Sequence, residues 1–329
     1  MPKPTITRTA EFVSPKHPDK ICDQISDAIL DAHLREDPYA RVAVDVAGGH
    51  GTIFITGEIS SKANSVTTEV INKIVHRLAG KTEAGKPYEV IIKIAQQSPE
   101  ISQGVDTGGA GDQGIMVGYA CNQTPEHLPL EYVLARNLNK FLYNIWPYDG
   151  KTQVTIREGE VLAIVVSFQH APSNKLRLAV KRWLKSEPLA ANLSYANLII
   201  HTNPAGDWHV GGFDADSGLT GRKLAVDNYG PRVPLGGGAF SGKDATKVDR
   251  SGAYMAREIA VHYLLQHQAS EVFVYLAYAI GHPEPVEATV TIDGLQQAIS
   301  GFKLSPEAII SYLKLRQPNF EQRARWGHF

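Results

Sequence analysis

The chain has little cysteine, no surplus of charge of one sign and no long apolar run, and each absence excludes a class of protein. Its 329 residues include only two cysteines, Cys22 and Cys121, too few for a disulfide framework or a cysteine-rich zinc module. With 33 basic and 34 acidic side chains, it lacks the positive surplus that a dedicated nucleic-acid binder needs. The apolar runs at residues 161–168 and 272–280 fall well short of the ~18 residues of a membrane helix.

What is present indicates a globular protein of more than one domain. Hydrophobic residues make up 43% of the chain and charged residues 20%, which is enough apolar material for a core. At roughly 100–150 residues per domain, the length favours two or three domains. The first residues lack the apolar stretch of a signal peptide, so we expect a cytoplasmic protein with no membrane partner.

Hydrophobic periodicity predicts a similar mixture of helices and strands in each third of the chain. Helices are expected at residues 19–35, 65–78, 130–143, 176–185, 252–267 and 306–315. Strands are expected at 41–47, 52–59, 90–95 (a buried one), 153–157, 161–169, 272–280 and 287–292. We therefore predict an α+β fold of three similar domains, sheets packed against helices, at residues 1–100, 101–209 and 210–329. The glycine-rich stretch 96–118 is expected to be a functional loop.

A second glycine-rich segment, residues 236–244, indicates phosphate binding. Read from Gly237 it matches the phosphate-loop pattern G-x-x-x-x-G-K, but Asp244 replaces the hydroxyl residue that would hold magnesium. It fails as a Walker loop, although clustered glycines still let the backbone approach an anion. Around it lie the charged residues Arg222, Lys223, Lys243, Lys247, Asp249 and Arg250. This grouping favours a bound polyphosphate with metal ions over a solvated loop with an incidental lysine.

The string Ser-Pro-Lys-His-Pro-Asp-Lys at residues 14–20 places His17 and Asp19 just before a predicted helix, where anions bind. Asp19, Asp23, Asp27 and Asp31 recur at intervals of four, so they share one helix face. We expect most of this stripe to be solvated. Asp19 is the exception, because it shares the loop with His17 and can reach a magnesium ion held by phosphates.

Two further carboxylates lie in predicted strands. Asp45 alternates with Val44 and Val46 and so faces the other side of its strand, either toward solvent or toward a site. Glu58 follows Gly57 near the end of the next strand, and recognition of an ammonium group by Glu58 is a hypothesis only.

At these motifs the chain resembles the S-adenosylmethionine synthetase (methionine adenosyltransferase) family along nearly its whole length. The matching strings lie at residues 17–27, 97–106, 109–114, 218–223 and 236–251, in the family's order. The resemblance implies three α+β domains about a pseudo-threefold axis, with active sites shared between the subunits of a homodimer, possibly paired into a homotetramer. It also implies that ATP and L-methionine are converted to S-adenosylmethionine, phosphate and diphosphate, with Mg²⁺ (two ions per site) and K⁺ as cofactors.

Roles of individual residues are likewise implied by the resemblance. The ATP ligands would be His17, Asp149, Lys151, Asp207, Trp208, Asp216, Arg222, Lys223, Ala239 and Lys243, of which His17, Lys151, Arg222 and Lys243 would be catalytic. Methionine would meet Glu58, Gln97, Asp216 and Lys247; Mg²⁺ would be held by Asp19 and Asp249, and K⁺ by Asp45. Trp208 would stack on the adenine base. Asp112 is expected near the site without a defined role.

Some positions depart from the family pattern. Asp45 replaces a glutamate, which puts the K⁺ dependence in question, and Asp207 and Trp208 replace an arginine and a phenylalanine at the adenine position. The segment at residues 107–108 is shorter than usual and the chain ends at residue 329, where many relatives continue, so gating or oligomeric state can differ. Two other readings remain open: a kinase or ATPase that uses the 237–243 loop, and a family member without catalytic activity.

Overall fold

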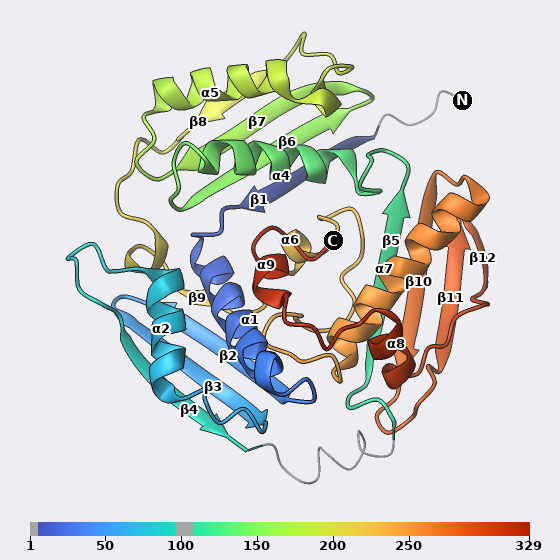
Figure 1. Cartoon of the computed structure of the whole chain (residues 1–329). Coiled ribbons are helices and arrows are strands. Elements are labelled where there is room, and N and C mark those ends of the chain that lie inside the picture. The colour runs from blue at the N-terminus through green and yellow to red at the C-terminus, as the bar shows by residue number, and fades with distance from the viewer. Residues whose placement is uncertain (1–5, 97–107) are drawn as a thin grey trace.

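The computed structural model describes residues 6–96 and 108–329 and arranges them as three α+β units around a common centre (Figure 1). The first unit contains α1 (Pro18–Glu36), β2 (Arg41–Gly49), β3 (Thr52–Ser60), α2 (Thr68–Ala79) and β4 (Glu89–Ala95). The second contains α4 (Leu130–Tyr143), β6 (Gly150–Arg157), β7 (Glu160–Phe168), α5 (Ser173–Ser186) and β8 (Ile199–Thr202). The third contains α7 (Val248–His267), β10 (Glu271–Tyr278), β11 (Glu287–Ile292), β12 (Leu295–Ala298) and α8 (Pro306–Tyr312). Each unit thus begins with a long helix followed by two antiparallel strands.

The three sheets share one strand order, and each takes its first strand from elsewhere in the chain. The borrowed strands are β9 (Gly218–Leu219), β1 (Thr7–Val13) and β5 (Gly114–Cys121). With them the sheets run β9-β2-β3-β4, β1-β6-β7-β8 and β5-β10-β11-β12. Along the chain, β1 leads into α1, β5 into α4, and β9 through α6 (Leu224–Asp227) into α7. Each borrowed strand therefore belongs to the sheet of one unit and feeds the helix of another, which closes the units into a ring.

The predicted domain ranges keep the hairpin of each unit together but not its complete sheet. Strand β1 lies in the range 1–100 and pairs with β6, while β5 lies in 101–209 and pairs with β10. Strand β9, in 210–329, pairs with β2. Periodicity indicates that a segment is a strand but not which strand it pairs with, which is why the sequence does not reveal this exchange.

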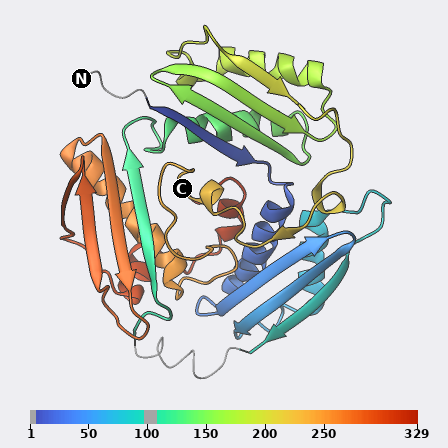
Figure 2. The ribbon, with the colours of Figure 1, turned by 180° about the vertical axis from the view of Figure 1, so that it is seen from behind.

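Helices cover one side of the sheets, and the other side is left open. Figure 1 views the helical side, and Figure 2 views the sheets from behind, with the C-terminal segment at the centre of both. Among the helices, α1, α4 and α7 each pack on the borrowed strand and on the first hairpin strand of their sheet. The open side carries exposed apolar residues such as Phe54, Ile91 and Ile115.

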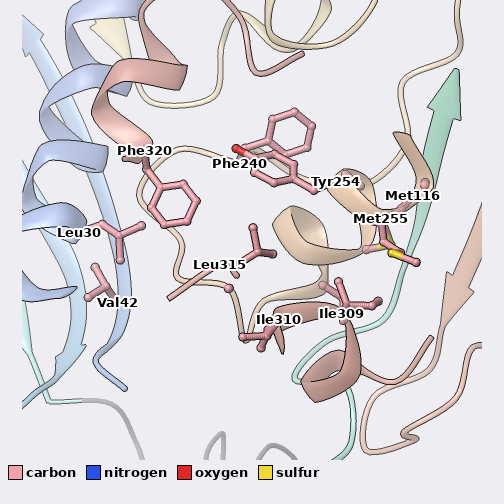
Figure 3. Close-up of a cluster of buried hydrophobic side chains, with 14 of the residues drawn as sticks. Leu30, Val42, Met116, Phe240, Tyr254, Met255, Ile309, Ile310, Leu315 and Phe320 are labelled. Atoms are coloured by element: carbon pink, nitrogen blue, oxygen red, sulfur yellow. The ribbon is translucent and has the colours of Figure 1, made fainter. Parts of the chain in front are cut away.

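The largest apolar core joins the first and third units. Leu30 of α1 and Val42 of β2 lie on one side of it, and Met255 of α7 and Ile309 of α8 on the other, with Phe320 of α9 (Phe320–Ala324) near α1 (Figure 3). A separate cluster fills the second unit. Burial of such side chains stabilises a domain by ~25 cal/mol per Å² of apolar surface removed from water.

The α+β fold of three similar domains is confirmed, and two local predictions are wrong. The strand expected to be buried at residues 90–95 is the outer strand β4, where Ile91 is 37% exposed. Residues 114–118 of the predicted glycine-rich loop belong instead to strand β5. Gly118 of this strand packs so closely on Ala256 of α7 that a side chain would not fit, so this glycine serves packing and does not mark a loop. No described helix is long and apolar enough to cross a membrane.

Strand β12 is absent from the sequence prediction, although the chain carries a signal for it. Asp293 and Gly294 connect β11 and β12, and both have positive φ (47° and 88°). An Asp-Gly pair in this conformation forms the tight turn that suits the twist of an antiparallel hairpin. The Asp-Gly dipeptide was the available clue.

Candidate functional site

His17 is fixed at the N-terminus of α1 as its cap. Its Nδ1 accepts the backbone N–H of Asp19 at 3.2 Å, and Pro18 occupies the first turn. Burial, and then the positive charges of Lys223 and Lys151, lower the pKa of His17 to about 3. The imidazole is therefore neutral, and because Nδ1 is an acceptor its proton lies on Nε2. His17 can donate one hydrogen bond from Nε2.

Asp19 joins this helix start to the 218–223 segment. Its Oδ1 accepts the backbone N–H of Leu219 at 2.9 Å, and its Oδ2 pairs with Lys223. The guanidinium of Arg222 lies 3.7 Å from Oδ1. Burial alone would raise the pKa of Asp19, but the hydrogen bonds from Lys223 and Leu219 lower it overall. An ionised carboxylate thus lies between two cations.

The acidic stripe of α1 is buried, so the prediction that most of it is solvated is wrong. Asp23 accepts the N–H of Gly221 at 2.8 Å, and Asp27 accepts the N–H of Gly242 at 2.8 Å. Asp31 accepts two backbone N–H groups, those of residues 320 and 321, at 3.0 Å each. The stripe faces backbone amides of the C-terminal third, which the sequence pattern alone does not show.

The 236–244 loop is held against the first unit. Gly242 has a φ of 82° and lies so close to Val44 of β2 that a Cβ would overlap the Val44 carbonyl oxygen, so only glycine fits. The carbonyl of Gly242 accepts the N–H of Val44 at 3.0 Å, and Lys243 pairs with Ala43 in antiparallel register. This contact places Lys243 at the open side of β2.

Asp249, in the first turn of α7, anchors the same loop from the third unit. Its Oδ1 accepts the N–H of Gly238 at 2.7 Å, and its Oδ2 pairs with Lys243 at 2.5 Å. Asp244 acts similarly toward Lys247, while also accepting the N–H of Val42 at 2.7 Å. Asp244 is therefore a structural anchor, which explains the departure from the phosphate-loop pattern.

The two cationic segments touch each other. A Cβ on Gly221, which has a φ of 79°, would lie 2.5 Å from the Cβ of Ala239. A Cβ on Gly218 would overlap the backbone of Pro18. Glycines at these positions let the 218–223 segment contact both the 236–244 segment and the start of α1.

The second unit contributes Lys151 and Asp149. Lys151 pairs with Val13 across β6 and β1, and its charge acts on His17. Asp149 accepts the N–H of Gly212 at 3.1 Å. Burial raises the pKa of Asp149 to about 6, and nearby Asp216 also raises it. These residues border the helix start on its second-unit side.

A cavity of about 380 Å³ lies beside these residues, between the first and second units. Asp149, Gln169, His170 and Gly211 line it. A Cβ on Gly211 would lie 2.8 Å from the indole of Trp208, so this ring packs against a residue that lines the cavity.

Asp207, next to Trp208, is engaged elsewhere. Its Oδ1 accepts the N–H of Ser173 at 3.0 Å and the amide of Asn203 at 3.1 Å. Its carboxylate therefore holds the first residue of α5.

Asp45 and Glu58 share the open face of the first sheet. Asp45 pairs with Thr56, and Glu58 with Ala43, so both lie opposite the buried valines of β2. Loss of hydration raises the pKa of Asp45, and the charge of Lys243 lowers it. The predicted alternation of Asp45 is confirmed. Gln97 lies outside the described residues, and Asp112 is exposed and accepts the N–H of Gln113.

Sequence reasoning missed Lys20, Asp227 and Arg250 as partners of the acidic stripe. Lys20 is fully buried between Asp23 (2.8 Å) and Asp227 (2.5 Å). Arg250, also fully buried, pairs with Asp27. The spacing of Lys20 from Asp23 was visible in the sequence, whereas the partners about 200 positions away were not.

Asp19 and Asp249 fit a role in holding Mg²⁺. Among the described residues, no three His, Cys, Asp or Glu side chains gather as a metal site by themselves. Proteins commonly hold Mg²⁺ through one or two carboxylates together with substrate phosphates. Each of these aspartates has one oxygen fixed by a backbone N–H and the other facing a lysine, so each can offer an oxygen to such an ion.

Fold and site together define a class: an α+β enzyme whose interlocked units bring lysines, arginines and isolated carboxylates together, a grouping that suits a polyphosphate. Models of the N-terminal, central and C-terminal domains of S-adenosylmethionine synthetase match residues 5–99, 107–208 and 210–329. The chain belongs to the S-adenosylmethionine synthetase family.

Similar proteins extend this match along the whole chain. The S-adenosylmethionine synthase of Salinibacter ruber is 42% identical, with 98% of this chain and 92% of the relative aligned. The synthases of Petrotoga mobilis and a Nitratiruptor species are 40% and 39% identical over the same shares.

Proposed function

We propose that this protein is a methionine adenosyltransferase, which forms S-adenosylmethionine from ATP and L-methionine and then hydrolyses the released triphosphate to phosphate and diphosphate. One observation carries the proposal: the 218–223 segment packs on the start of α1 beside His17 and also contacts the 236–244 loop. This arrangement gathers positive charge in a small region, where Asp19 faces Lys223 and Asp249 faces Lys243.

The reaction needs charge stabilisation more than acid–base chemistry. The methionine sulfur attacks the 5′ carbon of ATP, the carbon–oxygen bond breaks, and the triphosphate leaves with the electron pair. The sulfur becomes a sulfonium without losing a proton, so no general base is required. What remains is to align the reactants and to stabilise the departing polyanion.

His17 and the cations have separable roles in this step. Neutral His17 donates its Nε2 proton in a hydrogen bond to the oxygen that leaves the 5′ carbon. Lys151, Arg222, Lys223 and Lys243 hold the phosphate oxygens, with Ala239 beside them. Family members generally depend on Mg²⁺ and K⁺; Asp19 and Asp249 would hold two Mg²⁺ ions, which lower the charge of the polyphosphate when bound.

The remaining assignments follow the same motifs. Trp208 packs against Gly211 of a cavity large enough for a base, where its ring would stack on adenine, and Asp149 in the lining of that cavity would be a further ATP ligand. Methionine would be held by Glu58, Gln97, Asp216 and Lys247, and K⁺ by Asp45. Asp207 is the chain neighbour of Trp208, and its carboxylate is held by Ser173 and Asn203.

We also propose that two copies of the chain complete each site. Asp45 and Glu58 lie on the open side of the sheets, beside the exposed Phe54 and Ile91. A second copy on this face would cover those apolar side chains and enclose the substrates. Sedimentation of the purified protein tests this, since a monomer with full activity would contradict a shared site.

The decisive experiment is to mix the purified protein with ATP, L-methionine, Mg²⁺ and K⁺ and to analyse the products by mass spectrometry. We expect S-adenosylmethionine, phosphate and diphosphate without ADP. Release of ADP would instead indicate a kinase or ATPase, and ATP binding without turnover would indicate a non-catalytic family member. Omitting K⁺ tests the role of Asp45.

Three variants locate the activity. Lys243→Ala should lower kcat by about 10²–10³, as the loss of one stabilising donor does in other enzymes. His17→Asn keeps an acceptor for the N–H of Asp19 but removes the imidazole donor, and should reduce kcat with little change in stability. The exposed Lys185→Ala on α5 is the control and should leave kcat unchanged.

A further inference from the structure

A second cavity, of about 470 Å³, lies on the helical side of the molecule. Pro15 and Lys16, the end of α2, the end of α4 and the α9 segment line it. It contains none of the residues assigned above to ATP, methionine or metal ions. Its volume lies in the usual range for small-molecule sites, ~300–1,000 Å³.

The lining carries more positive than negative charge. Lys16, Arg35, Arg77 and Arg325 contribute four cations, against the two carboxylates of Asp31 and Glu321. Both carboxylates are already engaged. Asp31 accepts the N–H groups of residues 320 and 321, and Glu321 forms two hydrogen bonds with Arg77 at 2.6 and 2.8 Å.

The other three cations have no carboxylate partner within ion-pair distance in the described part of the chain. Lys16 donates only to the carbonyl of Leu78, at 2.7 Å. Arg325 lies over the ring of Tyr143, with 5.8 Å to the ring centre. Burial, and then the charges of Arg325 and Arg77, lower the pKa of Lys16, which shows that these cations repel one another.

We propose that this cavity is a second anion site, which binds a small molecule bearing a phosphate group between Arg35 and Arg325. Guanidinium groups suit phosphate because their N–H groups match its oxygens in pairs. An excess of two positive charges suits an anion of charge about −2 to −3, such as diphosphate or a phosphate monoester. Tyr143 and Pro15 add apolar walls for the remainder of an ester.

The site is separate from the candidate catalytic site but adjoins the same loop. Lys16 lines this cavity and also the cavity of about 380 Å³ described above, and the next residue is His17. Variants of Lys16 would therefore disturb both sites. Arg35 and Arg325 are exposed and have no role in the proposed catalysis, so they are the residues to change.

Protection from phenylglyoxal, followed by peptide mass spectrometry, tests the proposal on the full chain without Mg²⁺. Diphosphate at ten times its dissociation constant should slow modification of Arg35 and Arg325 about tenfold. Arg182, exposed on α5, should react at the same rate with and without diphosphate. Unchanged rates at Arg35 and Arg325 would overturn the proposal and mean that these cations only offset the negative ends of nearby helices.

A second measurement counts the sites. Equilibrium dialysis should find that R35Q/R325Q binds one diphosphate fewer per chain than the wild type, whereas the control R182Q/K185Q loses none. An equal count in all three proteins would contradict a second site. Turnover of ATP and methionine should persist in R35Q/R325Q. If the wild type itself shows no turnover, the proposed function is wrong, but the number of bound diphosphates still tests this cavity.

Replacing diphosphate with glycerol phosphate shows whether the cavity prefers an inorganic phosphate anion or a phosphate ester. Protection by both compounds would assign the cavity to phosphate esters, and protection by diphosphate alone would assign it to the inorganic anion. Protection of Arg222 without protection of Arg35 and Arg325 would place all binding at the catalytic site and overturn the second one.

Discussion

Helices α1 and α2 belong to the same unit and both show helical periodicity, yet their surroundings are opposite. All but two of the 19 residues of α1 are buried, while α2 buries only Ile71 and Val75. Acidic side chains follow the same division. Glu69 of α2 pairs with Lys73 in solvent, whereas the four aspartates of α1 accept backbone N–H groups from segments far away in the sequence. Equal spacing thus produces a solvated pair in one helix and a structural scaffold in the other.

The comparison teaches that the acidic stripe of α1 supplies hydrogen-bond partners to the 218–223 and 236–244 segments. These segments have few backbone partners within themselves, and a buried N–H without a partner costs about 1–3 kcal/mol. Asp19, Asp23 and Asp27 supply those partners. Two glycine-rich segments are therefore held in defined positions against α1.

The largest expected effect is that of Asp27→Ala, which tests whether the buried aspartates of α1 hold the fold together. It leaves Arg250, which is fully buried, without its carboxylate, so the free energy of unfolding should fall by about 3–5 kcal/mol. Lys73→Ala, which breaks the exposed pair of α2, is the control and should leave stability unchanged. Urea denaturation measures both, and similar values for the two variants would refute the scaffold role.

Gly242→Ala tests the contact of the 236–244 loop with the first unit by changing the loop. A Cβ would overlap Val44, so we expect a loss of about 3 kcal/mol and a raised KM for ATP. Gly301 also has a positive φ (83°) but open space around it, and Gly301→Ala should cost only about 1 kcal/mol. If both variants unfold at the same urea concentration, the close approach of the loop to β2 is unimportant.

A smaller effect is expected from pH at the buried end of the stripe. His328 is hydrogen-bonded to Tyr254 at 2.7 Å, and burial, then the charges of Arg250, Lys20 and Arg323, lower its pKa well below the usual value. The unfolded chain therefore binds a proton that the folded chain does not, so stability is kept above pH ~6.5 and falls below it.

The slope of this loss is at most about 1.4 kcal/mol per pH unit. His328→Asn should remove it, leaving a flatter profile between pH 7 and 5 when unfolding is followed by circular dichroism. Burial raises the pKa of other groups, such as Asp27 and Asp227, and these groups make the folded state more stable as the pH falls. Their contribution is the same in the variant and in the wild type. An identical pH profile for variant and wild type would show that His328 does not contribute to the pH dependence of stability.

The smallest effect should come from Asp207, which makes the same kind of contact as the stripe but in solvent. Asp207→Asn should leave the KM for ATP unchanged and lower the melting temperature only slightly. Trp208→Leu should raise that KM by removing the stacking surface. Steady-state kinetics compare the two, and a large rise in KM for Asp207→Asn would show that its carboxylate contacts the nucleotide.

Prediction from the sequence succeeded where the signal was local. The helix at residues 130–143 and the hairpin strands of each unit were found because apolar periodicity reports which face of an element is buried. His17 and Lys243 were singled out because prolines, glycines and cations clustered around them. The outer strand β4 was misjudged, since an apolar run does not reveal how many neighbours a strand has.

The sequence by itself determined the α+β class, the repeated order of helix and hairpin and the family, and it led us to predict phosphate binding by two segments. Only the tertiary structure decided the exchange of β1, β5 and β9, the burial of Asp23, Asp27 and Asp31, and the presence of Arg35 and Arg325 in the lining of one cavity. The physical reason is distance along the chain. A helix or a turn is set by residues a few positions apart, whereas the partner that makes a buried charge tolerable lies about 200 positions away.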